Sequence, residues 1–352
     1  MRFHFNEDQL LLRDTVRDFL KVECTPEGIR ALWETETGRS REFWSRLAAV
    51  GMPGLLVPQE CDGMGMDEID LVLLLEETGR AALAEPVIST AAVGVPLLCG
   101  LPAKPLAERW LRGVAAGEAV LAVGHPVSPF VSDAHVADLL LLPHAGELHA
   151  VARGDAELTR QPANDPSERL FTVKWKPVAD TLVARGEQAR GLLDAALDRG
   201  ALGCAAQQLG VAERLVAMTV EYASQRKQFG QPIGSFQAIK HMLADVQVRL
   251  EYARPVVYRA AHSVARSSPQ RAVDVSMAKS AAGETAQQAA RVALQVHGAL
   301  GYTWEQDLHI WMRRAWSLDA AWGSGAWHRA RVAGAVLDGE LPARTFGYSA
   351  PS

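Results

Sequence analysis

The segment YASQRKQFGQPIGSFQAIKHMLADV, residues 222–246, joins the end of one expected helix to the start of the next through a loop that contains Gly and Pro. Arg226 offers a planar fork of N–H donors, which suits an anionic group such as a diphosphate. Gln228 and Gln237 add side-chain amides, and Phe229 adds a flat ring. We interpret the segment as a clamp for such a group, the alternative being that Arg226 only caps its helix.

The size and composition of the chain set broad limits on its partners. It has 352 residues, 48% of them apolar, so two or three packed units with a large core are expected. The formal net charge is only −5, and no block of Lys and Arg occurs. Nucleic acid and anionic membranes are therefore not indicated as partners, whereas small molecules and proteins are.

Four scattered cysteines without a C-x-x-C spacing favour free thiols in a reducing compartment, so we expect a cytoplasmic protein. The N-terminus, MRFHFNEDQLLLRD, mixes charges into its first turns and shows no cleavable apolar region. The longest apolar run, 91–101, is too short and too interrupted by Pro to span a bilayer. We expect no membrane partner.

Hydrophobic periodicity divides the chain into three parts. Residues 1–117 form a mostly helical domain, with a first helix over 7–34 and another that begins at Asp67. Residues 118–185 contain short β-type runs separated by Pro, Asp, Asn and Gly, which predict a small β module. Residues 186–352 are Ala-rich and helical. The predicted fold class is mainly α with a small β domain.

Three more helices are expected in the C-terminal part after the one that precedes Arg226. They cover about 236–265, 270–296 and 307–338. Pro255 would kink the first of them, and Gly298 suits the end of the second.

Four segments, in this order, resemble the acyl-CoA dehydrogenase family. The likeness covers nearly the whole chain and implies an N-terminal helical domain, a middle β domain, here truncated, and a C-terminal four-helix bundle. It also implies FAD as cofactor, an acyl-CoA substrate and an electron-transfer flavoprotein as electron acceptor. The segments are FNEDQLLLRDTVRDFL, GMPGLLVPQECDGMGMDEIDLVLLLEETGRA, the stretch 222–246 and ALQVHGALGYTWEQDLHIWMRR.

The resemblance also implies which residues bind the cofactor. In the family, the positions that match the clamp hold the FAD of the neighbouring subunit across the interface. Ala299 is usually Gly in relatives, and its methyl group would crowd the approach of the backbone. The alternative for Gln295 is an ordinary residue on a helix surface. The implied set is Arg226, Gln228, Phe229, Gln237, Gln295, Gly298 and Ala299.

The catalytic base of the family has no counterpart in this chain. Its usual segment reads RRAWSLDAAWGS here and places Trp322 at the carboxylate position. An indole cannot take a proton from carbon. A second position used by some relatives as a Glu-Arg pair reads Gly200-Ala201. Asp198 and Asp319 are nearby acids, and Asp319 would lie one helical turn from Trp322, but a structural or surface role is the simpler interpretation of both.

A second departure lies in the β module. Relatives carry a motif like T-E-P-x-A-G-S-D and, about two strands later, a Trp-Ile-Thr-type segment, and both contact the flavin ring. Here AVLAVGHPVSPFVSDAHVADLLLL passes almost directly from the first strand to a later segment. We therefore expect that the module cannot cover a flavin ring held by its own subunit.

Two other signals carry less weight. The ten histidines show no H-x-x-x-H or Cys/His cluster, so no metal site is predicted. The Trp-rich tail could line a pocket for a flat, bulky ligand such as a sterol, but packing between helices or subunits is the simpler interpretation. Its members are Trp304, Trp311, Trp316, Trp322 and Trp327.

These features lead to the hypothesis of a base-less subunit of a heteromeric acyl-CoA dehydrogenase. A related subunit would supply the base, the flavin-ring site and the pocket for the acyl-CoA. The resemblance points to the actinobacterial heteromeric enzymes that shorten steroid side chains. The alternatives are a conventional homo-oligomeric enzyme with an unrecognised base and a non-enzymatic scaffold with the same fold.

Overall fold

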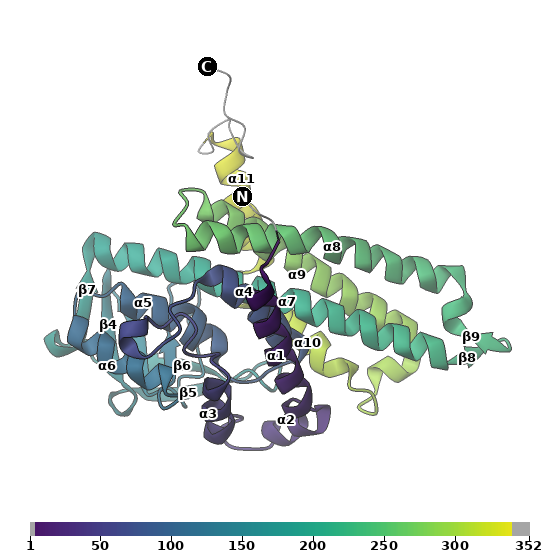
Figure 1. The fold of residues 1–352 in the computed structure, drawn as a ribbon, viewed down its shortest axis with the longest axis horizontal. Coiled ribbons are helices and arrows are strands. Elements are labelled where there is room, and N and C mark those ends of the chain that lie inside the picture. Colours follow the sequence, from purple (N-terminus) through teal and green to yellow (C-terminus); the bar gives the residue numbers. More distant parts are fainter. Residues whose placement is uncertain (1–3, 340–352) are drawn as a thin grey trace.

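The computed structural model describes residues 4–339. Figure 1 shows short strands on one side of the molecule and long C-terminal helices extending to the other, with the N-terminal helices packed beside them. No helix within the described range is both long and apolar enough to cross a membrane. The helices are α1 (Glu7–Glu23), α2 (Pro26–Trp33), α3 (Arg41–Ala49), α4 (Glu68–Arg80), α5 (Val95–Cys99), α6 (Lys104–Ala115), α7 (Gly186–Gln225), α8 (Gln237–Ala265), α9 (Arg271–His297), α10 (Leu308–Ala320) and α11 (Gly325–Leu337).

The predicted single helix over 7–34 is wrong, because the chain breaks into α1 and α2. The backbone N–H of Cys24 still bonds to Leu20, but Thr25 then caps a new helix by accepting from the backbone N–H of Gly28. Pro26 occupies the first turn of that helix, where its missing N–H costs nothing.

The predicted small β module is confirmed and contains two sheets. One has the strand order β1-β3-β4-β7 and the other β2-β6-β5. Between β1 and β3, which pair in parallel, the chain forms only the two-residue strand β2. The strands are β1 (Leu121–Val123), β2 (Val131–Ser132), β3 (Leu139–His144), β4 (Glu147–Ala152), β5 (Glu157–Gln161), β6 (Leu170–Lys174) and β7 (Leu182–Arg185).

Helix α7 is the longest element and connects the two sides of the molecule. Its 40 residues span about 60 Å, from the end of β7 to a small hairpin of β8 (Lys227–Gln228) and β9 (Gln231–Pro232), as Figure 1 shows. It packs against α8, α9 and α10 in the predicted bundle, and also against α4. Gly298 ends α9 as expected, with a positive φ of 61°.

Helices α4 and α7 cross with their backbones in contact. A Cβ atom on Gly210 would lie 1.8 Å from the carbonyl oxygen of Glu76, and one on Gly79 would lie 2.0 Å from that of Gln207. Both positions therefore require glycine, and the close crossing buries Glu76 and Glu77.

The predicted continuous helix over 307–338 is also wrong. Residues 321–324 separate α10 from α11, with positive φ angles at Trp322 (55°) and Gly323 (93°). Ser324 then caps α11 by accepting from the backbone N–H of Trp327. The helical spacing assumed between Asp319 and Trp322 therefore does not apply.

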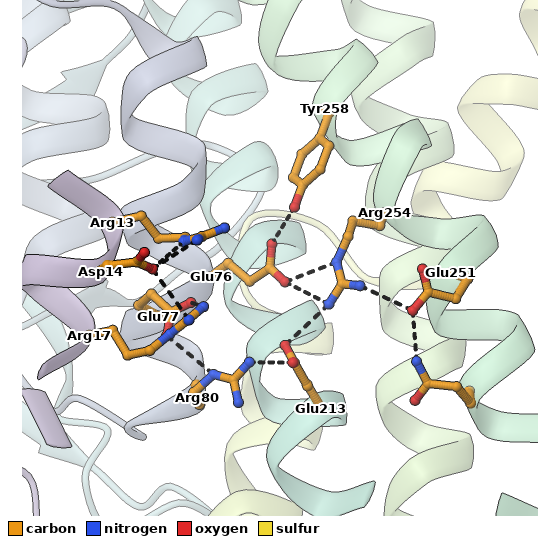
Figure 2. A network of polar contacts seen from close by, with 11 residues as sticks. Arg13, Asp14, Arg17, Glu76, Glu77, Arg80, Glu213, Glu251, Arg254 and Tyr258 are labelled. Carbon is orange, nitrogen blue, oxygen red and sulfur yellow. Dashed lines mark hydrogen bonds and ion pairs between the residues drawn. The ribbon is translucent and has the colours of Figure 1, made fainter. Parts of the chain in front are cut away.

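Figure 2 shows a polar network that links the buried acids of α4 to α1, α7 and α8. Arg254 donates to Glu76 (3.0 Å) and to Glu213 (3.1 Å), and Tyr258 donates to Glu76 (2.8 Å). On the other side of α4, Arg17 contacts Glu77 at 2.6 Å. Burial raises the pKa of Glu76, opposed chiefly by Arg254, so the ionised carboxylate depends on this guanidinium.

Replacing Arg254 with Ala should lower the free energy of unfolding by about 3 kcal/mol at pH 8, because it leaves a buried carboxylate without its counter-charge. The loss should shrink as the pH falls, since a protonated Glu76 needs no cation. Urea unfolding at pH 8 and pH 5 measures both effects. The control is Arg266→Ala, which removes an exposed pair with Asp67 and should cost less than about 1 kcal/mol. Equal losses for both variants would contradict the assignment.

Candidate functional site

The clamp begins where α7 ends. The backbone N–H of Arg226 donates to the carbonyl of Tyr222 (2.8 Å) and so closes the helix, which leaves the guanidinium free of a capping role. Among residues 4–339 this guanidinium has no hydrogen-bond or ion-pair partner. Gln228 ends β8, and Phe229 at the tip of the hairpin has a φ of 52° and is 92% exposed.

The other clamp residues lie at the same end of the bundle. Gln237 begins α8, while Gln295, Gly298 and Ala299 are at the end of α9, and all of them are exposed. The ends of α7 and α9 are held together by Tyr222, whose ring stacks on His297 at 4.2 Å between centroids. The structure therefore places these exposed residues at one end of the bundle.

The second candidate site surrounds Trp322. A Cβ atom on Gly200 would lie only 2.1 Å from the indole, so the tryptophan ring rests directly on the bare backbone of α7. The two positions at which the family resemblance predicts a base, Trp322 and Gly200, are thus in contact with each other. The contact between the indole and the glycine therefore fills the space at both positions.

Two buried side chains hold the loop that carries Trp322. The ammonium of Lys279, which is fully buried, donates to the carbonyls of Asp319 (2.9 Å) and Gly323 (3.2 Å). His328 Nε2 lies 3.0 Å from the carbonyl of Trp322, which makes it a donor there. Burial lowers the pKa of Lys279 and lowers that of His328 to about 4.

Two hollows flank Trp322. The inner cavity, only about 100 Å³, is lined by Trp322 together with Glu85, Glu168, Cys204 and Gln207, among others. The outer cleft, about 920 Å³, lies between the β module and the first turns of α7. It opens beside His125, Trp175 and Arg190.

Glu85 and Glu168 are site residues that the sequence did not single out. Burial raises the pKa of each to about 7. Glu85 accepts from the backbone N–H of Ser40, and Glu168 accepts from the hydroxyl of Ser317. No sequence signal marks them, because the loop of the β module that carries Glu168 meets α10 only in the folded chain.

Asp198 and Asp319, the two acids considered as substitute bases, do not face the inner cavity. Asp198 is 1% exposed and forms ion pairs with Arg271 and Arg331, both at 3.0 Å. The carboxylate of Asp319 lies beside Gly283 and Gly325. Neither carboxylate lines the inner cavity.

The tryptophans of the tail do not share one pocket. Trp311 is buried and donates to the carbonyl of Arg80 at 2.8 Å. Trp304 borders a separate hollow near Arg160, while Trp322 borders the inner cavity. Trp316 and Trp327 are partly exposed.

Comparisons with known proteins agree with this architecture. The acyl-CoA dehydrogenase N-terminal domain matches residues 6–118, and the acyl-CoA dehydrogenase C-terminal domain matches residues 191–337. The chain belongs to the acyl-CoA dehydrogenase family. The resemblance identified in the sequence is thereby confirmed.

Three relatives illustrate the match. Acyl-CoA dehydrogenase IpdE2 of Mycobacterium tuberculosis is 33% identical over 311 residues, which cover 88% of this chain and 91% of the relative. The crystal structure of the ChsE4-ChsE5 complex from Mycobacterium tuberculosis matches with a TM-score of 0.84 and 26% identity, over 97% of this chain and 100% of that chain. Butyryl-CoA dehydrogenase from Megasphaera elsdenii shares the fold, with a TM-score of 0.85 at 22% identity over 96% and 100% of the two chains.

The raised pKa of Glu168 predicts a pH dependence of stability. Burial keeps this carboxyl protonated in the folded chain up to about pH 7, whereas the ordinary pKa of a glutamate is 4.5. The stability that the protonated carboxyl confers on the folded chain is therefore lost as the pH rises from about 4.5 through 7. Glu168→Gln keeps the bond with Ser317 without a charge. The variant should therefore gain roughly 1–3 kcal/mol over the native chain between pH 5 and pH 8.

Urea unfolding across this pH range provides the measurement. Glu157→Gln is the control, because that side chain is 70% exposed and should show no such gain. If the difference in free energy of unfolding between Glu168→Gln and the native chain did not change with pH, the raised pKa of Glu168 would be contradicted.

Proposed function

We propose that this chain is a subunit of a heteromeric FAD-dependent acyl-CoA dehydrogenase and that it donates the clamp to the flavin site of a related partner. Desaturation of an acyl thioester requires a carboxylate that takes the α proton and a flavin that accepts the β hydrogen as hydride. The partner supplies the carboxylate, the ring site and the acyl-CoA pocket. This chain supplies Arg226 and its neighbours.

The observation that carries the proposal is the separation of the two sites along α7. Gly200, which faces Trp322, and Arg226 are 26 residues apart on one helix, or about 39 Å. A single extended flavin dinucleotide is too short to reach from one to the other. We therefore propose that a cofactor bound by Arg226 has its ring in another subunit.

The donor set fits a diphosphate. Arg226 presents an unpartnered guanidinium, the side chains of Gln228, Gln237 and Gln295 offer amide N–H groups, and Gly298 leaves the backbone approachable, since nothing lies within 4 Å of the position where a Cβ would be. An exposed cation beside amide donors is the chemistry that binds phosphate oxygens. Ala299 adds a methyl group at this edge and narrows the approach.

One of the structural matches supports a mixed complex. The ChsE4-ChsE5 match is to a chain of a complex of two named proteins, and that assembly is the arrangement we propose here. We propose a steroid-derived acyl thioester as the substrate class and an electron-transfer flavoprotein as the acceptor, both from the family resemblance.

A second candidate function is a self-sufficient homo-oligomeric dehydrogenase with Glu168 as its base. The favouring observation is a carboxyl with a pKa of about 7 that lines the same cavity as Trp322, which is a suitable value for a general base. Against it stands the cavity volume of about 100 Å³, which is too small for the reacting part of an acyl thioester beside a flavin.

Arg226→Ala should remove most of the flavin from the complex that co-purifies with the product of the adjacent gene, because the clamp loses its only guanidinium fork. The measurement is flavin absorbance per protein, with turnover of an acyl-CoA. Arg226→Lys should restore part of the flavin, since it keeps the charge without the fork. Arg249→Ala, an exposed arginine of α8, is the control and should retain full flavin content. Unchanged flavin in Arg226→Ala would instead favour a scaffold without a role in cofactor binding.

Glu168→Gln in the same complex separates the two candidate functions. Turnover should stay within about twofold of the native complex if the partner supplies the base. A loss of turnover of about a hundredfold or more, with the flavin still bound, would establish Glu168 as the base.

A further inference from the structure

Helix α7 lines both hollows, one after the other. Leu193 and Asp194 border the outer cleft, whereas Cys204 and Gln207 border the inner cavity. From Asp194 to Cys204 the helix rises about 15 Å. Gly200 lies between these two groups, at the point where the Trp322 ring rests on the helix.

The Trp322 ring stands at the boundary of the two hollows. It lines the inner cavity, and it lies 6.0 Å, centroid to centroid, from the ring of His125, which lines the outer cleft. The space that a side chain at position 200 would fill is already taken by the indole. Glycine and tryptophan are therefore complementary here, one omitting the volume that the other adds.

The loop is fixed on both sides of the ring. Lys279 bonds to the carbonyl of Asp319 before Trp322 and to that of Gly323 after it. His328 bonds to the carbonyl of Trp322 itself and, through Nδ1, to Ser276 at 3.0 Å. Since these groups are buried, releasing the loop would leave charged or polar atoms unsatisfied.

We propose that Trp322, seated on Gly200 and positioned by Lys279 and His328, is a fixed partition that closes the inner cavity from the outer cleft and excludes acyl thioesters from this subunit. This inference rests on the proposed function and adds a substrate stoichiometry to it. A pair of unlike subunits then binds one acyl thioester. Removal of the ring would join the two hollows.

Alkylation of Cys204 by iodoacetamide measures the partition in the full chain, because this thiol is 1% exposed and lines the inner cavity. Trp322→Ala should raise its rate at least about tenfold, since the reagent then enters without local unfolding. Peptide mass spectrometry assigns the rate to each cysteine. Cys61, which is only 2% exposed and lies in the N-terminal domain, is the internal control. Its alkylation rate should not change, whereas a loosened fold would raise the rates of both cysteines.

A matched Trp→Ala substitution in α10, the helix that precedes the loop of Trp322, gives the second control. Trp316 is 42% exposed and lies outside the inner cavity, so Trp316→Ala should leave the Cys204 rate unchanged. Lys279→Met should raise the Cys204 rate relative to Cys61, as expected of a positioning residue that holds the loop.

The complementarity of the pair has its own test. Gly200→Ala should lower the midpoint of thermal unfolding by roughly 5 °C, because its methyl group and the indole claim the same space. In the Trp322→Ala background, Gly200→Ala should lower the midpoint much less, because the indole no longer occupies that space. Additive losses would contradict the packing.

Two results would overturn the partition: equal Cys204 rates in the native chain and in Trp322→Ala, or saturable binding of octanoyl-CoA that protects Cys204 in the native chain. These outcomes are distinct from failure of the flavin proposal. Loss of flavin in Arg226→Ala with an unchanged Cys204 rate in Trp322→Ala would retain the shared site and reject the partition. An unchanged flavin content in Arg226→Ala with a raised Cys204 rate in Trp322→Ala would retain the partition and reject the shared flavin site.

Discussion

The backbones of α4 and α7 are in contact at Gly79 and Gly210, and this contact sets the positions of the other helices around α7. It brings two helices closer than any side chain would allow, and it buries Glu76 and Glu77 as a consequence. Ionised acids in that position need cations, which α1 and α8 supply as Arg17 and Arg254 in the network of Figure 2. The crossing thus fixes the long helix α7, so that its first turns face the β module and its last residue delivers Arg226 to the opposite side.

The two ends of α7 have different chemical character. Toward the N-terminal end, at Gly200, the space that a side chain would occupy is filled by the indole of Trp322. At the other, a cation, several amides and an aromatic ring remain exposed. Position 322 therefore holds a packed indole, and its loop is anchored by Lys279 and His328. Such anchoring keeps the core dense, as folded proteins require.

Much of this architecture could be predicted from the sequence. The helical periodicity before Arg226 and the helix end at Gly298 could be predicted, because each depends on neighbouring residues. The break at Trp322 could not, since a tryptophan with positive φ has no local signature and is imposed by Lys279 from another helix. Strand β5 lacks the alternation of buried and exposed residues, and β2 has only two residues. Contacts such as Glu168 with Ser317 join residues 149 positions apart, which no local pattern encodes.

An experimental structure of the complex formed with the partner subunit, with FAD bound, tests the central claim most directly. We expect the diphosphate to lie against Arg226 of this chain and the isoalloxazine ring to lie on the partner's β domain. A flavin ring seated on this chain's own strands β1 to β7, with a carboxylate of this chain above it, would contradict it.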